Sequence, residues 1–192
     1  RAAAYALVYG AGGMDGDVTL TGREDLVDGS YLYRPAGIVH GHLESAREGC
    51  MALIKLSQTL DFNLVEQPTS QDEYPHFPTT DGRGHILHLR TPQAPATVVD
   101  GERGRYERVT MSEDRAARSQ SLLLRFPVDW QGRIELDATD AWEWFVADGS
   151  IVLADGTRFD RSGYSFRPPG HAPAAAIAGA AAGTRLLLWR NT

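Results

Sequence analysis

Short apolar segments separated by polar turns run along the whole chain. Each segment holds four to eight residues rich in Val, Ile, Leu, Tyr, Phe and Trp and is bounded by Gly, Asp, Ser or Pro. No stretch keeps the apolar spacing of three and four residues that predicts an amphipathic helix. The pattern therefore predicts an all-β sandwich or barrel. The candidate strands are residues 5–9, 17–21, 31–35, 51–57, 60–66, 85–89, 121–126, 142–146, 150–154, 164–168 and 185–190.

The order of these parts occurs twice. In each copy an apolar strand leads to an Asp-Gly turn, a second strand, and an aromatic strand that ends in Arg-Pro. The interval from Gly16 to Arg34 equals the interval from Gly149 to Arg167, and Tyr31 falls at the same place as Tyr164. We infer two copies of one β unit.

The intervening sequence is polar and rich in proline and glycine, which is typical of linkers and surface loops. The second copy can open with strands near Val98 and between Tyr106 and Met111, whereas the first begins almost at once with a strand, so we expect a native start upstream of Arg1. The expected boundaries are residues 1–66 for the first, partial unit, 67–96 for a linker and loop, and 97–192 for the second unit.

Composition narrows the classes of function. The chain has 192 residues, of which 42% are hydrophobic and 23% charged, so it can bury a core. The net charge of −6, without a basic block, argues against nucleic acid or an anionic membrane as a partner. A single cysteine, Cys50, excludes an internal disulfide framework, and we therefore expect a cytoplasmic protein. We expect the Cys50 thiol to be buried and inert. No apolar run is as long as a membrane span.

The repeated Arg-Pro-x-Gly segments resemble the cupin superfamily. Residues 35–40 read Pro-Ala-Gly-Ile-Val-His, which is similar to the second cupin motif, and the duplicated layout is similar to a bicupin. The resemblance implies an all-β fold of two tandem jelly-roll barrels, the first lacking its opening strands in this chain.

The resemblance also implies a metal site. Metal-dependent cupins hold a divalent ion such as iron, manganese, zinc or nickel with two histidines and a glutamate of a first motif and a histidine of the second. His40 falls on the second-motif histidine of barrel one, whose first motif would lie mostly before Arg1. In barrel two the ligand positions fall on Glu135, Asp137, Trp142 and Pro173. That barrel is therefore expected to hold no metal, unless Asp137, Glu143 and His171 form an oxygen-rich site.

Barrel one supplies four candidate site residues. His40 and His42 are two residues apart, so on a strand they share a face and can both be ligands, although two surface histidines at a strand end would have the same spacing. Glu44 is either a carboxylate ligand or a solvated turn residue. Arg34 can clamp a substrate carboxylate or form a structural ion pair.

Barrel two supplies the remaining candidates. Arg167 has the same two interpretations as Arg34. Trp142 and Trp144 either line a ligand pocket or pack in the core, and His171 is either a polar group at the pocket mouth or a loop histidine.

Two further histidines receive a structural interpretation. His85 and His88 are three residues apart, so on a regular strand they point to opposite faces and do not form a ligand pair.

The leading functional hypothesis, implied by the resemblance, is a metal-dependent enzyme of the oxygenase or isomerase type, with its small-molecule pocket in the N-terminal barrel. The alternatives are a metal-free bicupin that binds a small molecule, and a structural dimerisation module. The sequence contains no P-loop, dinucleotide-binding glycine motif, nucleophile elbow or zinc-protease motif. Exposed sheet edges lead us to expect a homodimer.

Overall fold

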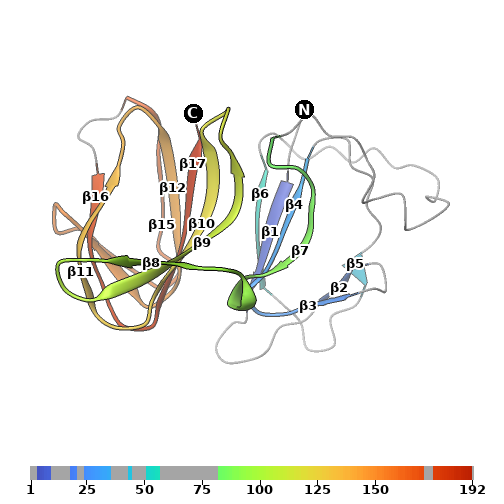
Figure 1. Cartoon of the computed structure of the whole chain (residues 1–192), viewed down its shortest axis with the longest axis horizontal. Helices are drawn as coiled ribbons and strands as arrows, with labels where there is room; N and C mark the ends of the chain where they lie inside the picture. The colour runs from blue at the N-terminus through green and yellow to red at the C-terminus, as the bar shows by residue number, and fades with distance from the viewer. Residues whose placement is uncertain are drawn as a thin grey trace. The chain divides into compact units, whose positions relative to one another are not determined.

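The computed structural model describes residues 4–9, 18–20, 24–35, 43–44, 51–56, 82–170 and 175–191. These residues form β-strands and one short 3-10 helix, η2 (Thr91–Gln93), with no α-helix among them, which confirms the all-β prediction. The chain divides into two compact units, Arg1–Gln93 and Ala94–Thr192 (Figure 1). No helix in the described part of the chain is long and apolar enough to span a membrane.

The described residues of the first unit form two antiparallel sheets. One has the strand order β6-β1-β4-β7 and the other β3-β2-β5. Strand β7 lies at the end of the expected linker but pairs with β4, so it belongs to the first unit's sheet. The strands are β1 (Ala4–Tyr9), β2 (Val18–Leu20), β3 (Glu24–Leu26), β4 (Ser30–Arg34), β5 (Leu43–Glu44), β6 (Met51–Leu56) and β7 (Ile86–Arg90).

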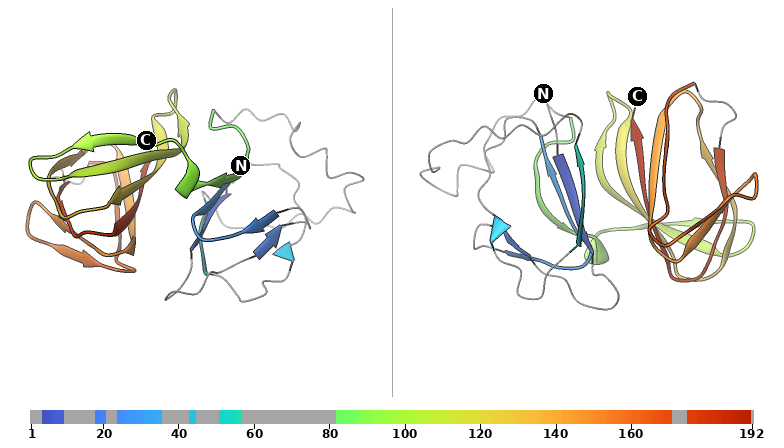
Figure 2. Two further views of the ribbon diagram at one scale, coloured as in Figure 1. Left: turned by 60° about the horizontal axis from the view of Figure 1, so that its bottom comes forward. Right: turned by 180° about the vertical axis from the view of Figure 1, so that it is seen from behind.

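The second unit also contains two antiparallel sheets, whose arrangement can be followed in Figure 2. A six-stranded sheet has the order β15-β12-β17-β10-β9-β8, and a four-stranded sheet has the order β11-β16-β13-β14. The strands are β8 (Thr97–Asp100), β9 (Arg105–Asp114), β10 (Ser119–Phe126), β11 (Trp130–Leu136), β12 (Ala141–Asp148), β13 (Ser150–Leu153), β14 (Arg158–Asp160), β15 (Tyr164–Arg167), β16 (Ala175–Ala180) and β17 (Thr184–Asn191).

A continuous apolar core fills the second unit. Alternate residues of the strands point inward and form one buried cluster. At one end of it the rings of Tyr106, Phe126 and Trp130 lie 5.3–5.4 Å apart, centroid to centroid. The cluster consists of Tyr106, Leu122, Leu124, Phe126, Trp130, Leu136, Trp142, Trp144, Val146, Ile151, Leu153, Ile177, Ala180, Leu186 and Leu188.

The two units share a three-strand arrangement. In the first unit β1 lies between β4 and β6, and in the second β12 lies between β15 and β17. Both outer strands of each set run antiparallel to the central one. Arg34 ends β4 and Arg167 ends β15, so the two arginines occupy corresponding places in the two sets.

Most candidate strands coincide with observed ones, and β8 and β9 cover the expected opening strands of the second unit. Strands β3, β5, β11, β14 and β16 were not predicted. Strand β16 has the sequence AAIAGA, and alanine and glycine have low β propensity, so pairing with β11 and β13 makes it a strand. The candidate strand at 60–66 lies outside the described residues.

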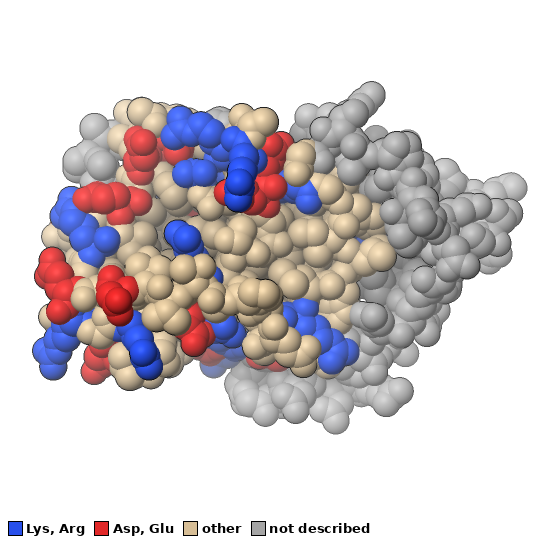
Figure 3. Space-filling model, viewed as in Figure 1, with Lys and Arg blue, Asp and Glu red and all other residues tan. Residues whose placement is uncertain are grey.

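Charges of both signs are interspersed on the described part of the face shown in Figure 3.

Candidate functional site

The structure does not describe every residue that the sequence singled out. His40, His42 and His171 lie outside the described residues, and Glu44 is placed only as the last residue of β5. The structure does describe Arg34 and Arg167, and it describes Trp142 and Trp144. The contacts of these side chains indicate how much space each unit leaves for a ligand.

Trp142 and Trp144 fill the interior of the second unit. They lie on the inward side of β12, belong to the core cluster, and are 8% and 0% exposed. The indole Nε1 of Trp142 donates a hydrogen bond to the main-chain oxygen of Asp137 at 2.9 Å. The ring of Phe159 packs edge-on against Trp144, with centroids 5.6 Å apart. These side chains therefore occupy the space in which a barrel ligand would lie.

Arg167 closes over this aromatic interior. Its cross-strand neighbour is Trp142, and its guanidinium carbon lies 5.5 Å from the ring centroid of Trp144. Arg167 also lowers the pKa of Asp155, after the larger effect of hydrogen bonds from Thr157. No ion pair is formed between Arg167 and a described carboxylate, so the contact is a cation–π interaction rather than the structural ion pair considered from the sequence.

A buried carboxylate lies near the same end of β12. The side chain of Asp140 is 1% exposed, and its Oδ2 lies 3.1 Å from a terminal nitrogen of Arg118 and 3.9 Å from Nε of Arg190. The guanidinium of Arg190 lies over the ring of Trp142, 6.0 Å from its centroid. Charged groups at this end thus pair with one another and with the indoles.

The carboxylates of the second unit do not converge on a metal site. Glu143 alternates with the inward tryptophans on β12, and its Oε1 accepts a hydrogen bond of 2.8 Å from the hydroxyl of Tyr164. Burial, and secondarily this contact with Glu143, raise the pKa of Tyr164 to about 12. Asp137 is exposed and binds the main-chain N–H and hydroxyl of Thr139, which lower its pKa. These donors do not fit a metal ion, and the described residues contain no cluster of three possible ligands.

The first unit presents a different set of side chains on β4, on β7 and at His85, which directly precedes β7. Arg34 donates from a terminal nitrogen to Nε2 of His85 at 3.3 Å, and the hydroxyl of Ser30 lies 2.8 Å from Nε2 of His88. Ser30 and Arg34 are four residues apart on β4 and so share a face. The sequence placed the two histidines on opposite faces. The structure instead brings both to this face, because the register of β4 and β7 shifts between Tyr31 and Tyr33.

The positions of β1 opposite Arg34 and Leu32 are both alanine. The register places Ala4 opposite Arg34 and Ala6 opposite Leu32, whereas Trp142 lies opposite Arg167 in the second unit. On β6, Ile54 is paired with Ala6 and is 57% exposed. Two tryptophans on β12 therefore correspond to two alanines on β1.

Solved structures with similar folds were found, although the sequence matches no family model and no curated protein. Protein Ylba from E. coli has a TM-score of 0.62 at 11% identity over 100% of this chain. The salicylate 1,2-dioxygenase from Pseudaminobacter salicylatoxidans has a TM-score of 0.59 at 15% identity over 99%. The quercetin 2,3-dioxygenase from Acinetobacter baumannii has a TM-score of 0.56 at 11% identity over 100%.

The fold is of the cupin type. The chain spans 68%, 65% and 65% of the lengths of these three proteins. At such identities the likeness shows the cupin fold alone, and activity has to be argued from this chain's own residues.

Proposed function

We propose that this cupin-fold chain is a metal-dependent enzyme that converts a small organic molecule in its first unit, by oxygenase or isomerase chemistry. The observation that carries the proposal is the difference between the residues at corresponding positions of β12 and β1. The interior of the second unit is filled by Trp142 and Trp144 under Arg167, whereas the corresponding strand of the first unit carries alanines opposite Arg34 and Leu32. The dioxygenases among the fold neighbours support the reaction type.

In the proposed site, His40 and His42 are the metal ligands and Glu44 a third donor or a substrate contact. A divalent ion held there would supply Lewis acidity or a binding position for oxygen. His85 is assigned to substrate orientation rather than to metal binding, because its Nε2 accepts a hydrogen bond from the Arg34 guanidinium. Arg34 and His85 instead orient the polar end of the substrate, the arginine by charge-assisted hydrogen bonding.

Substrate turnover by the metal-loaded, full-length protein tests the proposal. Oxygen consumption and product formation are followed with salicylate, gentisate and quercetin, and enolisable keto acids test for isomerisation. We expect turnover of at least one class, lost in His40→Ala and retained in Arg167→Ala. Turnover that survives His40→Ala, or none with any class, would overturn the proposal.

A metal-free binding function is the second candidate. The engagement of His85 by Arg34 and of His88 by Ser30 favours it, because it shows that polar groups of the first unit can satisfy one another without an ion. This alternative predicts binding of the same small molecules without turnover and without dependence on His40.

A further inference from the structure

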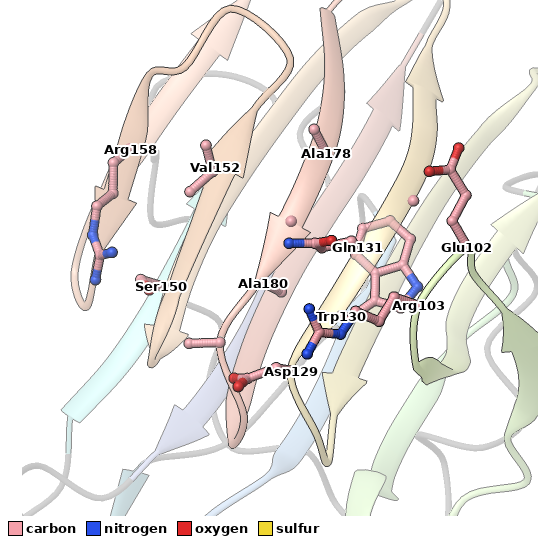
Figure 4. A pocket seen from close by; sticks show the side chains of 13 residues that line it. Glu102, Arg103, Asp129, Trp130, Gln131, Ser150, Val152, Arg158, Ala178 and Ala180 are labelled. Atoms are coloured by element: carbon pink, nitrogen blue, oxygen red, sulfur yellow. The ribbon is translucent and has the colours of Figure 1, made fainter.

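The two sheets of the second unit present different surfaces. The four-stranded sheet carries a polar groove of about 580 Å³, and Figure 4 shows Arg158 on one side of it and Arg103 and Gln131 on the other. Arg158 is paired with Asp160, so part of the charge of this groove already has a partner within the unit. The six-stranded sheet instead ends in an edge strand, β15, that exposes apolar side chains.

Tyr164 and Phe166 are the exposed side chains of β15. Each is 53% exposed, and no other aromatic residue is found among the exposed large hydrophobic residues in the described part of the chain. They are two residues apart, so they share one face of the strand. Their cross-strand neighbours on β12, Phe145 and Glu143, are only 8% and 9% exposed. The exposed apolar surface therefore lies at the edge of the sheet itself.

The main-chain groups of Tyr164 and Phe166 point away from β12. The N–H of Val146 donates a hydrogen bond of 2.9 Å to the main-chain oxygen of Gly163. Hydrogen-bonded pairs in an antiparallel ladder recur at every second residue, so in the register of β15 against β12 the next such residue is Ser165. The N–H and C=O groups of Tyr164 and Phe166 thus face the open edge, where a further strand can bind them.

We propose that β15 pairs with β15 of a second copy of this chain, antiparallel and centred on Ser165. In that register Tyr164 of each copy lies opposite Phe166 of the other, and the main-chain groups that face the open edge in one copy bond to those of the other. The two aromatic pairs lie on one face, and cross-strand pairs of this kind stabilise a sheet. The contact is isologous, so it closes at the dimer.

The residues that flank β15 favour this register over its neighbours. Centring the pairing on Tyr164 would place Arg161 opposite Arg167, and like charges directly opposite each other are destabilising. Centring it on Phe166 would place Tyr164 opposite Pro168, which has no N–H to donate.

The register centred on Ser165 avoids both conflicts. It places Arg167 opposite Gly163 and Arg161 opposite Pro169, so no like charges are opposed. The strand is thus complementary to itself in charge and in its aromatic side chains, which is the reason for naming a second copy as the partner. The proposal identifies the edge that forms the homodimer expected from the sequence, and it is independent of the function of the first unit.

Sedimentation of the full chain over a range of concentrations tests the proposal. We expect a dimer, and Phe166→Lys is expected to weaken it at least about tenfold, because both aromatic pairs are lost. The lysine would lie beside Glu143, so the substitution is compatible with the fold. The matched control is Val98→Lys, at a residue 55% exposed on β8, the opposite edge of the same sheet, and it should leave association unchanged. Thermal unfolding checks that both variants keep the fold.

Cysteine cross-linking tests the register. Ser165 of one copy lies opposite Ser165 of the other in a non-hydrogen-bonded pair, whose Cα atoms are about 4.5 Å apart and so within reach of a disulfide. In a Cys50→Ser background, mild oxidation is expected to cross-link Ser165→Cys between copies and not Val98→Cys. The proposal is overturned if the chain is a monomer at every concentration, if folded Phe166→Lys associates as the parent does, or if a dimer forms in which Ser165→Cys does not cross-link.

Discussion

The guanidinium of Arg167 lies over the indole of Trp144, 5.5 Å from its ring centroid. Trp144 is fully buried in the apolar core of the second unit. The charged group of Arg167 therefore packs directly against that core. In the first unit the corresponding arginine, Arg34, instead lies opposite Ala4 and contacts His85. This contrast is the basis for placing the chemistry in the first unit.

Trp144→Ala is expected to destabilise the protein by about 3–5 kcal/mol, because it removes a fully buried side chain and leaves a cavity. Urea unfolding measures the change in free energy. Val128→Ala, at a residue 48% exposed, is the control and should change it by less than about 0.5 kcal/mol. A Trp144→Ala variant as stable as the parent would show that the interior is not packed as described.

Asp140→Ala is expected to lower the free energy of unfolding by about 2 kcal/mol, because it removes the buried partner of Arg118. The matched control is Asp160→Ala, which breaks the exposed pair between Asp160 and Arg158 and should cost about 0–1 kcal/mol. Equal losses in the two variants, measured by urea unfolding, would contradict the burial of Asp140.

Tyr164 is expected to titrate at about pH 12, above the ordinary tyrosine value of 10.0, because burial and the Glu143 carboxylate disfavour the phenolate. Since the pKa is raised in the folded state, the neutral phenol stabilises the fold below pH 10, and this contribution is lost as the pH rises from 10 to about 12. Ultraviolet absorbance of the phenolate follows the titration.

The difference between the parent and Tyr164→Phe isolates this tyrosine from Tyr106, whose pKa is also raised by burial. Glu143→Gln should lower the pKa of Tyr164, although not fully to 10, because burial is the larger cause. A difference titration centred near pH 10 in the parent would show that neither burial nor the Glu143 carboxylate raises the pKa of Tyr164 in solution.

Strand positions followed from sequence wherever a short apolar segment lies between turn residues, as in β12 and β17. Strand β16 could not be predicted in this way, because its alanines carry little β propensity and only its neighbours make it a strand. The contact between Tyr164 and Glu143 likewise depends on the register of β15 against β12, which the sequence does not specify.

The candidate site was predictable in part. Arg34 and Arg167 were identified from the repeat, but their different contacts depend on cross-strand partners, alanine in one case and tryptophan in the other. His85 and His88 were misassigned to opposite faces, because strict alternation ignores the register shift in the pairing of β4 with β7. Their spacing of three would have suggested a shared face only if an irregularity had been anticipated.

Metal content of the full-length protein, purified without an affinity tag or chelator, tests the central claim most directly. Elemental analysis is applied to the parent, to His40→Ala, and to His171→Ala as the matched control from the second unit. The account predicts close to one divalent ion per chain, lost in His40→Ala and kept in His171→Ala. A parent without metal, or an ion lost only in His171→Ala, would contradict it.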